Sequence, residues 1–271
     1  MANSQSAIGV FDSGMGGLTV LQALKEALPL ETFVYLGDTA RLPYGTKSQN
    51  TVLQYVIQMT RLLVERDIKA LVIACNTATT ASLPHLQEML PDIPILGVVS
   101  PGAMAAVLAT RNHRIAVLAT ETTIASQAYQ KLIVQQLPEA TVYTRACSLL
   151  VALAEEGMME NGIAREALCH YLKDLHDEDT ILLGCTHFPV FKPMIKSLLP
   201  SHVAVVDSAE ATASALKNIL LEQQLLNHDT QEFSETTYLV TDSVQRFKTV
   251  GELFLGESLI SAPVELVDVK S

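Results

Sequence analysis

The chain has 271 residues, 49% of them hydrophobic, and its 18 basic and 29 acidic residues give a formal net charge of −11. This composition excludes a disordered chain, and the negative charge, without any Lys/Arg cluster, disfavours a nucleic-acid partner. The longest apolar runs have the length of a strand, well short of the roughly 20 residues that a membrane span needs, and the N-terminus lacks a secretory signal, so we expect a soluble, cytoplasmic protein with no membrane partner.

Short apolar runs alternate with longer amphipathic segments along the chain. The runs predict strands at Ala7–Phe11, Thr32–Leu36, Ala70–Ala74, Ile95–Val98, Ile115–Leu118, Thr141–Tyr143, Thr180–Leu183, Val203–Val206 and Thr237–Val240. Helical periodicity between them includes Leu18–Leu28, Gln49–Arg66, Ala164–Leu175 and Ala209–Gln224. The alternation predicts an α/β protein with mostly parallel sheets covered by helices on both faces, in which ligands bind beyond the carboxyl ends of the strands.

A weak internal repeat runs through this pattern. The segments "AIGVFDSGMGGLTV" and "RIAVLATETTIAS" both read as a strand, a small polar turn and a helix. Cys75 follows Asp12 by 63 residues, and Cys185 follows Thr120 by 65. The repeat predicts two pseudo-symmetric lobes, each a mostly parallel sheet flanked by helices, with one thiol from each in the cleft between them.

Two segments are interpreted as crossing points between the lobes. These are the Pro/Gly-marked "GVVSPGA" (Gly97–Ala103) and "VVDSAEA" (Val205–Ala211). The first lobe is therefore expected to comprise residues 1–98 plus 208–271, with the second lobe, residues 99–207, inserted into it.

A polar turn follows each of the first two predicted strands. In "GVFDSGMGGL", Asp12 and Ser13 precede a glycine-rich turn whose exposed amides could hold a carboxylate or phosphate; a structural turn capped by Asp12 is an equally weighted alternative. In "GDTARLPYGTKS", Pro43, Tyr44 and Gly45 could form a rigid, backbone-exposing wall, although an ordinary turn also explains the segment.

Four cysteines are widely scattered, and no CxxC pair predicts a zinc or thioredoxin-type site, so no metal site is expected. Cys169, inside a helical pattern, is interpreted as an ordinary buried cysteine. Cys75 and Cys185 differ, because each ends a strand, in "ALVIACNTATTA" and "TILLGCTHFPVF". A following helix start would lower the thiol pKa from about 8.5.

The residues beside these two thiols suit an amino-acid ligand. Asn76, Thr77 and Thr186 can hydrogen-bond a carboxylate or an ammonium group, and His187 could tune Cys185 or transfer a proton. A nucleophilic hydrolase needs one thiol and a base. Two opposed thiols fit the inversion of a stereocentre, in which one thiolate abstracts a proton and the other thiol donates one.

The combination resembles the bacterial glutamate racemases, of the cofactor-independent aspartate/glutamate racemase superfamily. The matching segments occur in family order: "GVFDSGMGGLTVL", "YLGDTARLPYGTKS", "LVIACNTATTASL", "GVVSPGA", "LATETTIAS", "LLGCTHFP" and "VDSAEATA". The histidine of "GCTHFP" is the specific feature, because aspartate-racemase-like members usually carry an acidic residue there.

The resemblance implies a role for each site residue. Cys75 and Cys185 would be the acid/base pair, assisted by Asp12 and His187 respectively. Expected substrate contacts are Ser13, Pro43, Tyr44, Gly45, Asn76, Thr77, Thr120, Thr123 and Thr186. Glu155 matches an assisting carboxylate, but "CSLLVALAEEG" has Ser148 and Ala152 where the family usually has proline. A surface carboxylate is therefore the alternative for Glu155.

The implied activity is interconversion of L- and D-glutamate by α-proton exchange, without pyridoxal phosphate or another cofactor. The implied setting is D-glutamate supply for peptidoglycan by a homodimer whose small-molecule partner is glutamate. Three alternatives stay open at this point: an aspartate or hydantoin racemase, a cysteine hydrolase using Cys185 and His187, and a two-lobed amino-acid sensor.

Overall fold

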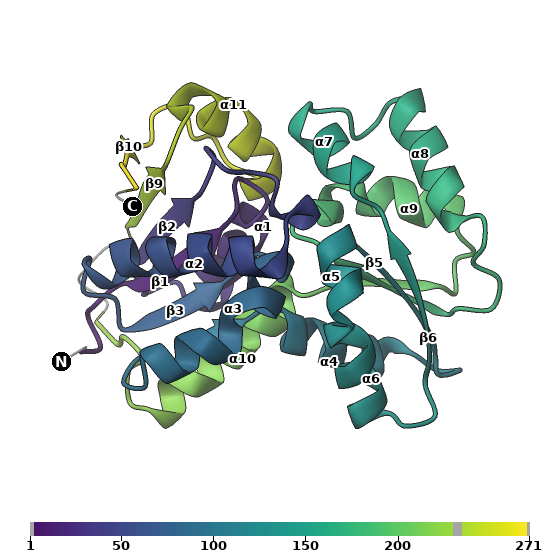
Figure 1. Ribbon diagram of the computed structural model, residues 1–271, viewed down its shortest axis with the longest axis horizontal. Helices are drawn as coiled ribbons and strands as arrows, with labels where there is room; N and C mark the ends of the chain where they lie inside the picture. The colour runs from purple at the N-terminus through teal and green to yellow at the C-terminus, as the bar shows by residue number, and fades with distance from the viewer. Residues whose placement is uncertain (1–2, 230–234, 270–271) are drawn as a thin grey trace.

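The computed structural model describes residues 3–229 and 235–269, and it contains two parallel β-sheets side by side (Figure 1). The larger sheet has the strand order β10-β9-β2-β1-β3-β4, and every pair of neighbours is parallel. Its strands are β1 (Ile8–Asp12), β2 (Phe33–Gly37), β3 (Ala70–Ile73), β4 (Ile95–Gly97), β9 (Thr236–Val240) and β10 (Val264–Leu266).

The smaller sheet repeats the arrangement of the larger one. Its order is β6-β5-β7-β8, again with parallel neighbours, and it matches β2-β1-β3-β4 strand for strand. Its strands are β5 (Arg114–Ala119), β6 (Thr141–Ala146), β7 (Thr180–Gly184) and β8 (Ala204–Asp207). The two cysteine-ended strands, β3 and β7, therefore occupy equivalent places beside β1 and β5.

Helices cover both faces of each sheet, as buried parallel strands require. Around the larger sheet, α2 and α3 pack together on one face and α1, α10 and α11 on the other. Around the smaller sheet, α4 and α6 lie opposite α7, α8 and α9. The helices are α1 (Leu18–Ala27), α2 (Gln49–Val64), α3 (Asn76–Met89), α4 (Val99–Ala109), α5 (Glu121–Ser126), α6 (Ala128–Gln136), α7 (Leu149–Glu155), α8 (Gly162–Leu172), α9 (Lys192–Leu198), α10 (Ala209–Glu222) and α11 (Val244–Leu255), with short 3-10 turns η1 (Tyr44–Thr46) and η2 (Phe188–Phe191).

One continuous apolar core joins the two halves of the molecule. It runs from the α1, α10 and α11 face of the larger sheet to the α7, α8 and α9 face of the smaller one. Members such as Leu21, Phe247, Leu153 and Phe191 are almost completely buried. Burial on this scale is the main stabilising contribution to such a fold, and here it fixes the carboxyl ends of both sheets toward each other.

The α/β class and the paired, similarly ordered lobes predicted from sequence are confirmed. All nine predicted strands are present, with their ends shifted by at most three residues. The pattern missed β10, an edge strand of three residues. The residue bounds given above for the two lobes remain a prediction. Within the part of the chain described here, no helix is both long enough and apolar enough to span a membrane.

Candidate active site

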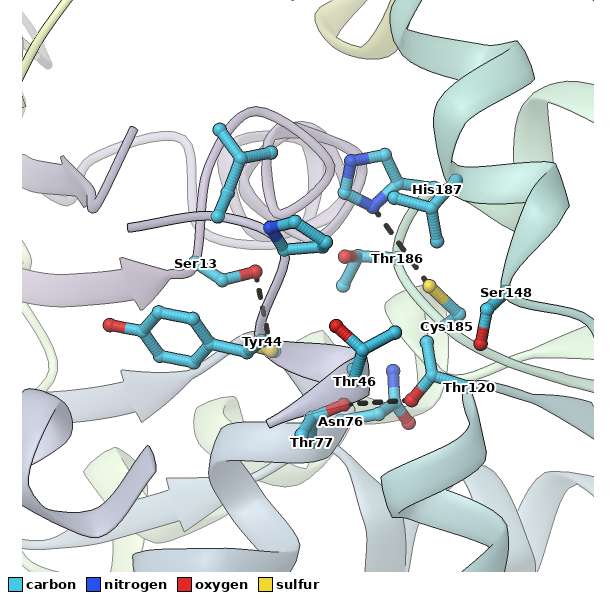
Figure 2. Close-up of a pocket in the computed structure, with 15 residues that line it drawn as sticks. Ser13, Tyr44, Thr46, Asn76, Thr77, Thr120, Ser148, Cys185, Thr186 and His187 are labelled. Atoms are coloured by element: carbon cyan, nitrogen blue, oxygen red, sulfur yellow. Dashed lines mark hydrogen bonds between the residues drawn. The ribbon is translucent and has the colours of Figure 1, made fainter. Parts of the chain in front are cut away.

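Cys75 and Cys185 line the same cavity, between the two sheets. Cys75 is the residue that caps the N-terminus of α3 just beyond β3, and Cys185 directly follows β7. The cavity is small, with a volume of about 40 Å³, and its walls come from both halves of the molecule. In Figure 2, Ser13, Asn76 and Thr77 lie across this space from Cys185, Thr186 and His187.

Most residues predicted for the site line this cavity. They are Ser13, Pro43, Tyr44, Gly45, Cys75, Asn76, Thr77, Thr120, Cys185, Thr186 and His187. Asp12, Thr123 and Glu155 do not line it and lie behind residues that do. The sequence analysis missed four lining residues, Leu42, Thr46, Ser148 and Val151. Leu42 and Thr46 flank Pro43, Tyr44 and Gly45 in the polar turn "GDTARLPYGTKS", so that turn was a signal that could have found them, whereas Ser148 and Val151 lie in neither of the two polar turns described above.

Cys75 lies in a setting that opposes the expected activation of its thiol. Burial and, to a smaller extent, the nearby Asp12 charge raise the pKa of Cys75 to about 12, although the amide of Ala78 and the hydroxyl of Ser13 act in the opposite direction. These two groups lie 3.5 and 3.6 Å from Sγ. The helix-start effect predicted from sequence therefore exists, but desolvation outweighs it, and the prediction of a lowered pKa at Cys75 is wrong.

Asp12, at the end of β1, is completely buried behind Ser13. Its carboxylate accepts hydrogen bonds from the Gly14 amide at 2.9 Å and from the Thr186 hydroxyl at 3.3 Å. Burial raises the pKa of Asp12 despite the charge of His187 and these hydrogen bonds. The Thr186 contact crosses from one sheet to the other, so Asp12 is in contact with both walls of the cavity.

Cys185 differs from Cys75 in its charged neighbour, which is the basic side chain of His187 rather than the carboxylate of Asp12. No α-helix begins at Cys185, since only the short turn η2 follows, so the predicted helix start is wrong here. Instead, its Sγ lies 3.9 Å from Nδ1 of His187, whose Nε2 lies 2.9 Å from a carboxylate oxygen of Glu155. Burial disfavours the imidazolium, yet the contacts with Cys185 and Glu155 raise the pKa of His187 to about 10.

Glu155, the last residue of α7, is largely enclosed, with 11% of its side chain exposed. The alternative of a surface carboxylate is therefore wrong. The α11 helix supports this region through two residues that the sequence analysis did not single out. Arg246 donates to the Glu155 carbonyl at 3.2 Å, and the Phe254 ring meets the His187 ring edge-on at 5.2 Å between centroids.

Three threonine hydroxyls form a closed ring across the cavity floor. Thr77 lies 2.9 Å from Thr120 and 3.1 Å from Thr123, which are themselves 3.0 Å apart. Thr77 belongs to α3, whereas Thr120 precedes α5 and Thr123 lies within it. Next to this ring, the Thr122 hydroxyl reaches the carbonyls of Gly45 and Lys47 at 3.0 and 2.9 Å.

The wall formed by Pro43, Tyr44 and Gly45 is held from behind by a buried carboxylate. In Figure 2 the Tyr44 hydroxyl turns away from the cavity. It donates to Asp38, which is fully buried directly after β2. Asp38 also pairs with Arg41 Nε at 2.7 Å and accepts from the Thr241 hydroxyl at 2.8 Å. Tyr44 thus offers its ring and backbone to the cavity, and its phenol serves to anchor the wall.

Cys169 was predicted to be buried, and that prediction is wrong. It lies on α8 and is exposed, whereas Cys75, Cys147 and Cys185 are buried. Among residues 3–229 and 235–269, no group of three His, Cys, Asp or Glu side chains is arranged to hold a metal ion. The polar groups of the cavity are instead uncharged donors, the two thiols and His187.

Comparison with known proteins gives consistent matches. Residues 8–216 match the Asp/Glu/Hydantoin racemase family. The chain is 48% identical over 255 residues to a glutamate racemase of Geobacter metallireducens, covering 93% of this chain and 94% of that one. A Bacillus anthracis glutamate racemase structure superposes with a TM-score of 0.92 at 37% identity, covering 98% and 99% of the two chains. A Francisella tularensis glutamate racemase in complex with D-glutamate gives 0.91 at 35% identity, with the same coverage.

Proposed function

The chain belongs to the Asp/Glu/Hydantoin racemase family, and on that premise we propose that it is a glutamate racemase, in which Cys75 and Cys185 exchange the α-proton. The observation that carries the proposal is that both thiols, from equivalent strand ends of two similarly ordered sheets, line one cavity. The choice of glutamate is supported by similar proteins named glutamate racemase, one of them in complex with D-glutamate.

The proposed reaction moves one proton on and one proton off the α-carbon. The thiolate of one cysteine takes the α-proton and becomes a thiol, and the electron pair of the broken C–H bond stays on the carbon. The thiol of the other cysteine then gives its proton to the opposite face and becomes a thiolate. The product has inverted configuration, and the enzyme returns to its starting state through the reverse turnover or by proton exchange with water.

On the Cys75 side, we assign Asp12 as the assisting residue. A thiol with a pKa of about 12 needs a nearby base before it can act as a thiolate near neutral pH. The Asp12 carboxylate, whose own pKa is raised by burial, is suited to receive and return that proton. Its contact with Thr186 also keeps this carboxylate within the site rather than free to rotate away.

On the Cys185 side, we assign His187 as the assisting residue and Glu155 as its support. An imidazolium 3.9 Å from Sγ stabilises a thiolate and can return a proton to it. Glu155 holds the ring by its other nitrogen, so that Nδ1 remains directed at Cys185. The two thiols therefore have different partners, a carboxylate for Cys75 and an imidazole for Cys185.

Binding groups around the cavity suit the α-carboxylate of an amino acid. Hydroxyl and amide donors from Ser13, Asn76, Thr77, Thr120 and Thr186 supply preorganised hydrogen bonds to the carboxylate next to the reacting carbon, where negative charge develops. Thr123 acts through the hydroxyl ring, and the backbone of Pro43, Tyr44 and Gly45 closes the far wall. The enclosed site also keeps water from the reacting carbon.

We propose the wider setting on the same basis. The enzyme would act in the cytoplasm as a homodimer, without a cofactor, and supply D-glutamate for peptidoglycan, with lobes bounded at residues 98 and 207. The charge of −11 supports the absence of a nucleic-acid partner. Sedimentation at several protein concentrations tests the dimer.

The activity is tested with purified, pyridoxal-free protein in deuterated water. The circular-dichroism signal of L-glutamate should decay as the amino acid racemises. Each inversion should place one deuterium at the α-carbon. Aspartate and a substituted hydantoin are the parallel substrates. If the α-hydrogen of aspartate or of the hydantoin exchanges and that of glutamate does not, the exchanging compound is the substrate. If glutamate binds without exchange of its α-hydrogen, the protein is better described as an amino-acid sensor.

A further inference from the structure

Tyr129, on α6, is a buried residue with a direct connection to the cavity. It is 1% exposed, and its hydroxyl donates to Oδ1 of Asn76, on α3. The two residues come from opposite sides of the cavity, since α6 packs on the smaller sheet and α3 on the larger. Tyr129 does not line the cavity, so any effect that it has on a ligand passes through Asn76.

The other end of the Asn76 amide is unpaired. Asn76 is 3% exposed, and its Nδ2 is buried without a hydrogen-bond partner. Buried donors are normally satisfied, because an unpaired one keeps its full desolvation cost. Figure 2 shows the amide nitrogen of Asn76 toward the middle of the pocket. An acceptor oxygen of a bound ligand would satisfy this donor.

The amide can face the cavity with its nitrogen only if its oxygen is fixed elsewhere. Rotation by half a turn would exchange the two ends and place an acceptor toward the substrate. The Tyr129 hydroxyl opposes that rotation, since it needs an acceptor. Burial, followed by the charges of Cys185 and Asp207, raises the pKa of Tyr129, so the phenol keeps the proton that it donates.

The position of the phenol is itself fixed by close packing. A Cβ at Gly184, the residue before Cys185, would lie 2.8 Å from Cε2 of Tyr129, and a Cβ at Gly102 would lie 3.0 Å from its hydroxyl oxygen. Glycine at both places allows the ring to lie against the end of β7. The hydroxyl consequently has little freedom to follow a moving amide.

We propose that Tyr129 is a positioning residue that orients the Asn76 amide, so that Nδ2 donates to a carboxylate oxygen of the substrate. The inference rests on the proposed function, because it assumes an amino acid in this cavity. The alternative is a purely structural tyrosine, which packs in the core with Val99, Ile115 and Leu182 and affects stability alone.

The test combines Tyr129→Phe, Asn76→Ala and the double variant, with Tyr238→Phe as the control. Tyr238 is also a buried tyrosine with a hydrogen-bonded hydroxyl, but it does not line the cavity or contact Asn76. Tyr129→Phe keeps the ring and removes one hydrogen bond, so KM for both enantiomers of glutamate should rise about three- to ten-fold. The change in kcat should be smaller, because the contact is made in the ground state and the transition state alike.

The double variant provides the decisive comparison. If Tyr129 acts through the amide, its substitution should change KM in the native background and have no further effect when Asn76 is alanine. An unchanged KM in Tyr129→Phe, or effects of the two substitutions that multiply, would overturn the inference. In either case racemisation by the unsubstituted enzyme would leave the proposed function intact, whereas absence of glutamate racemisation in that enzyme would overturn both.

Discussion

Glu155, which does not line the cavity, and His187, which does, form a pair whose oxygen and nitrogen lie 2.9 Å apart. The imidazole is held between a carboxylate on one side and a thiol sulfur on the other, with Phe254 against its ring. The contacts with Cys185 and Glu155 outweigh the effect of burial, so this buried histidine has a pKa of about 10 rather than a lowered one. It also makes the protonation of His187 depend on Glu155.

Replacement of Glu155 by Gln should lower the pKa of His187 while keeping a hydrogen-bond acceptor in place. His187 would then lose its proton at a lower pH, and the alkaline limb of the kcat/KM profile should move to lower pH. The profile is measured with D- and L-glutamate between pH 6 and 11. Glu156→Gln is the control, because Glu156 is exposed and pairs with Arg246 outside the cavity. Identical alkaline limbs in the two variants would contradict the assigned role of Glu155.

The same pair should affect stability in a defined pH range. The folded-state pKa of His187, about 10, lies above its ordinary value near 6.5. Its contribution to the free energy of unfolding is therefore fully present below pH 6.5 and is lost as the pH rises through 10. Denaturant unfolding of the native protein and of His187→Asn should differ most at the acidic end of that range. A difference that grows toward pH 10 would have the wrong sign.

Substitution of either proposed acid/base thiol should abolish racemisation. Cys75→Ser and Cys185→Ser should each lower kcat by about 10²- to 10⁴-fold, the usual contribution of a general acid or base. With a substrate analogue that carries a good leaving group, each variant should retain one-sided elimination, with opposite enantiomer preferences. Product formation from each enantiomer is followed separately. Equal preferences in the two variants would contradict a site with two bases.

Gly16 should tolerate no side chain. A Cβ there would lie 2.4 Å from Nδ1 of His187 and 2.6 Å from the hydroxyl oxygen of Thr186. Gly16→Ala should displace the imidazole and lower kcat by about 10²-fold, since a misplacement of about 1 Å can have that effect. Gly162→Ala is the control, because a Cβ at that position meets nothing within 4 Å. Comparable activity of the two variants, measured by circular dichroism, would show that His187 has room to move.

Loss of the Asp38 charge should loosen the wall that contains Tyr44. Asp38→Asn leaves Arg41 without its anionic partner, and we expect the free energy of unfolding to fall by about 1–3 kcal/mol. KM for glutamate should rise more than kcat falls, because the wall binds substrate and does not exchange protons. Asp242→Asn, at an exposed position nearby, is the control. A change confined to kcat would place Asp38 in the chemical step instead.

Cys169 should be the first thiol to react with a bulky aromatic disulfide reagent. It is exposed, whereas the other three cysteines are buried. One thiol per chain should titrate quickly in the folded protein without loss of racemisation, and Cys169→Ser should remove that fast phase. Rapid inactivation of the Cys169→Ser protein would mean that a cavity thiol is open to large reagents.

The fold and the thiol positions follow from short-range patterns in the sequence. Apolar runs such as Ala70–Ile73 and Thr180–Gly184 specify buried parallel strands, and the polar residues that follow them must emerge at the same sheet edge. The edge strand β10 has only three residues, so its pattern is too short to separate it from a loop.

Electrostatics and support of the site depend on contacts between distant segments. Local sequence places Cys75 at a helix start, but only the packed structure shows that desolvation raises its pKa. Tyr129 reaches Asn76 across 53 residues of chain, and Arg246 reaches Glu155 across 91. Cys169 lies on a helix whose periodicity does not show which face is covered. These properties arise from tertiary packing, so no local pattern could predict them.

The order of strands along the chain has a consequence for how the protein is made. All of β5 to β8 lie between β4 and β9 in the chain. The ribosome therefore synthesises every strand of the smaller sheet, which carries Cys185, before it synthesises β9 of the larger sheet. The Thr241 hydroxyl that reaches Asp38 directly follows β9. Until that late segment emerges, the nascent chain holds both cysteines and the contacts of Asp38 with Tyr44 and Arg41, but it lacks the Thr241 contact, so the support behind Tyr44 is completed only late in synthesis.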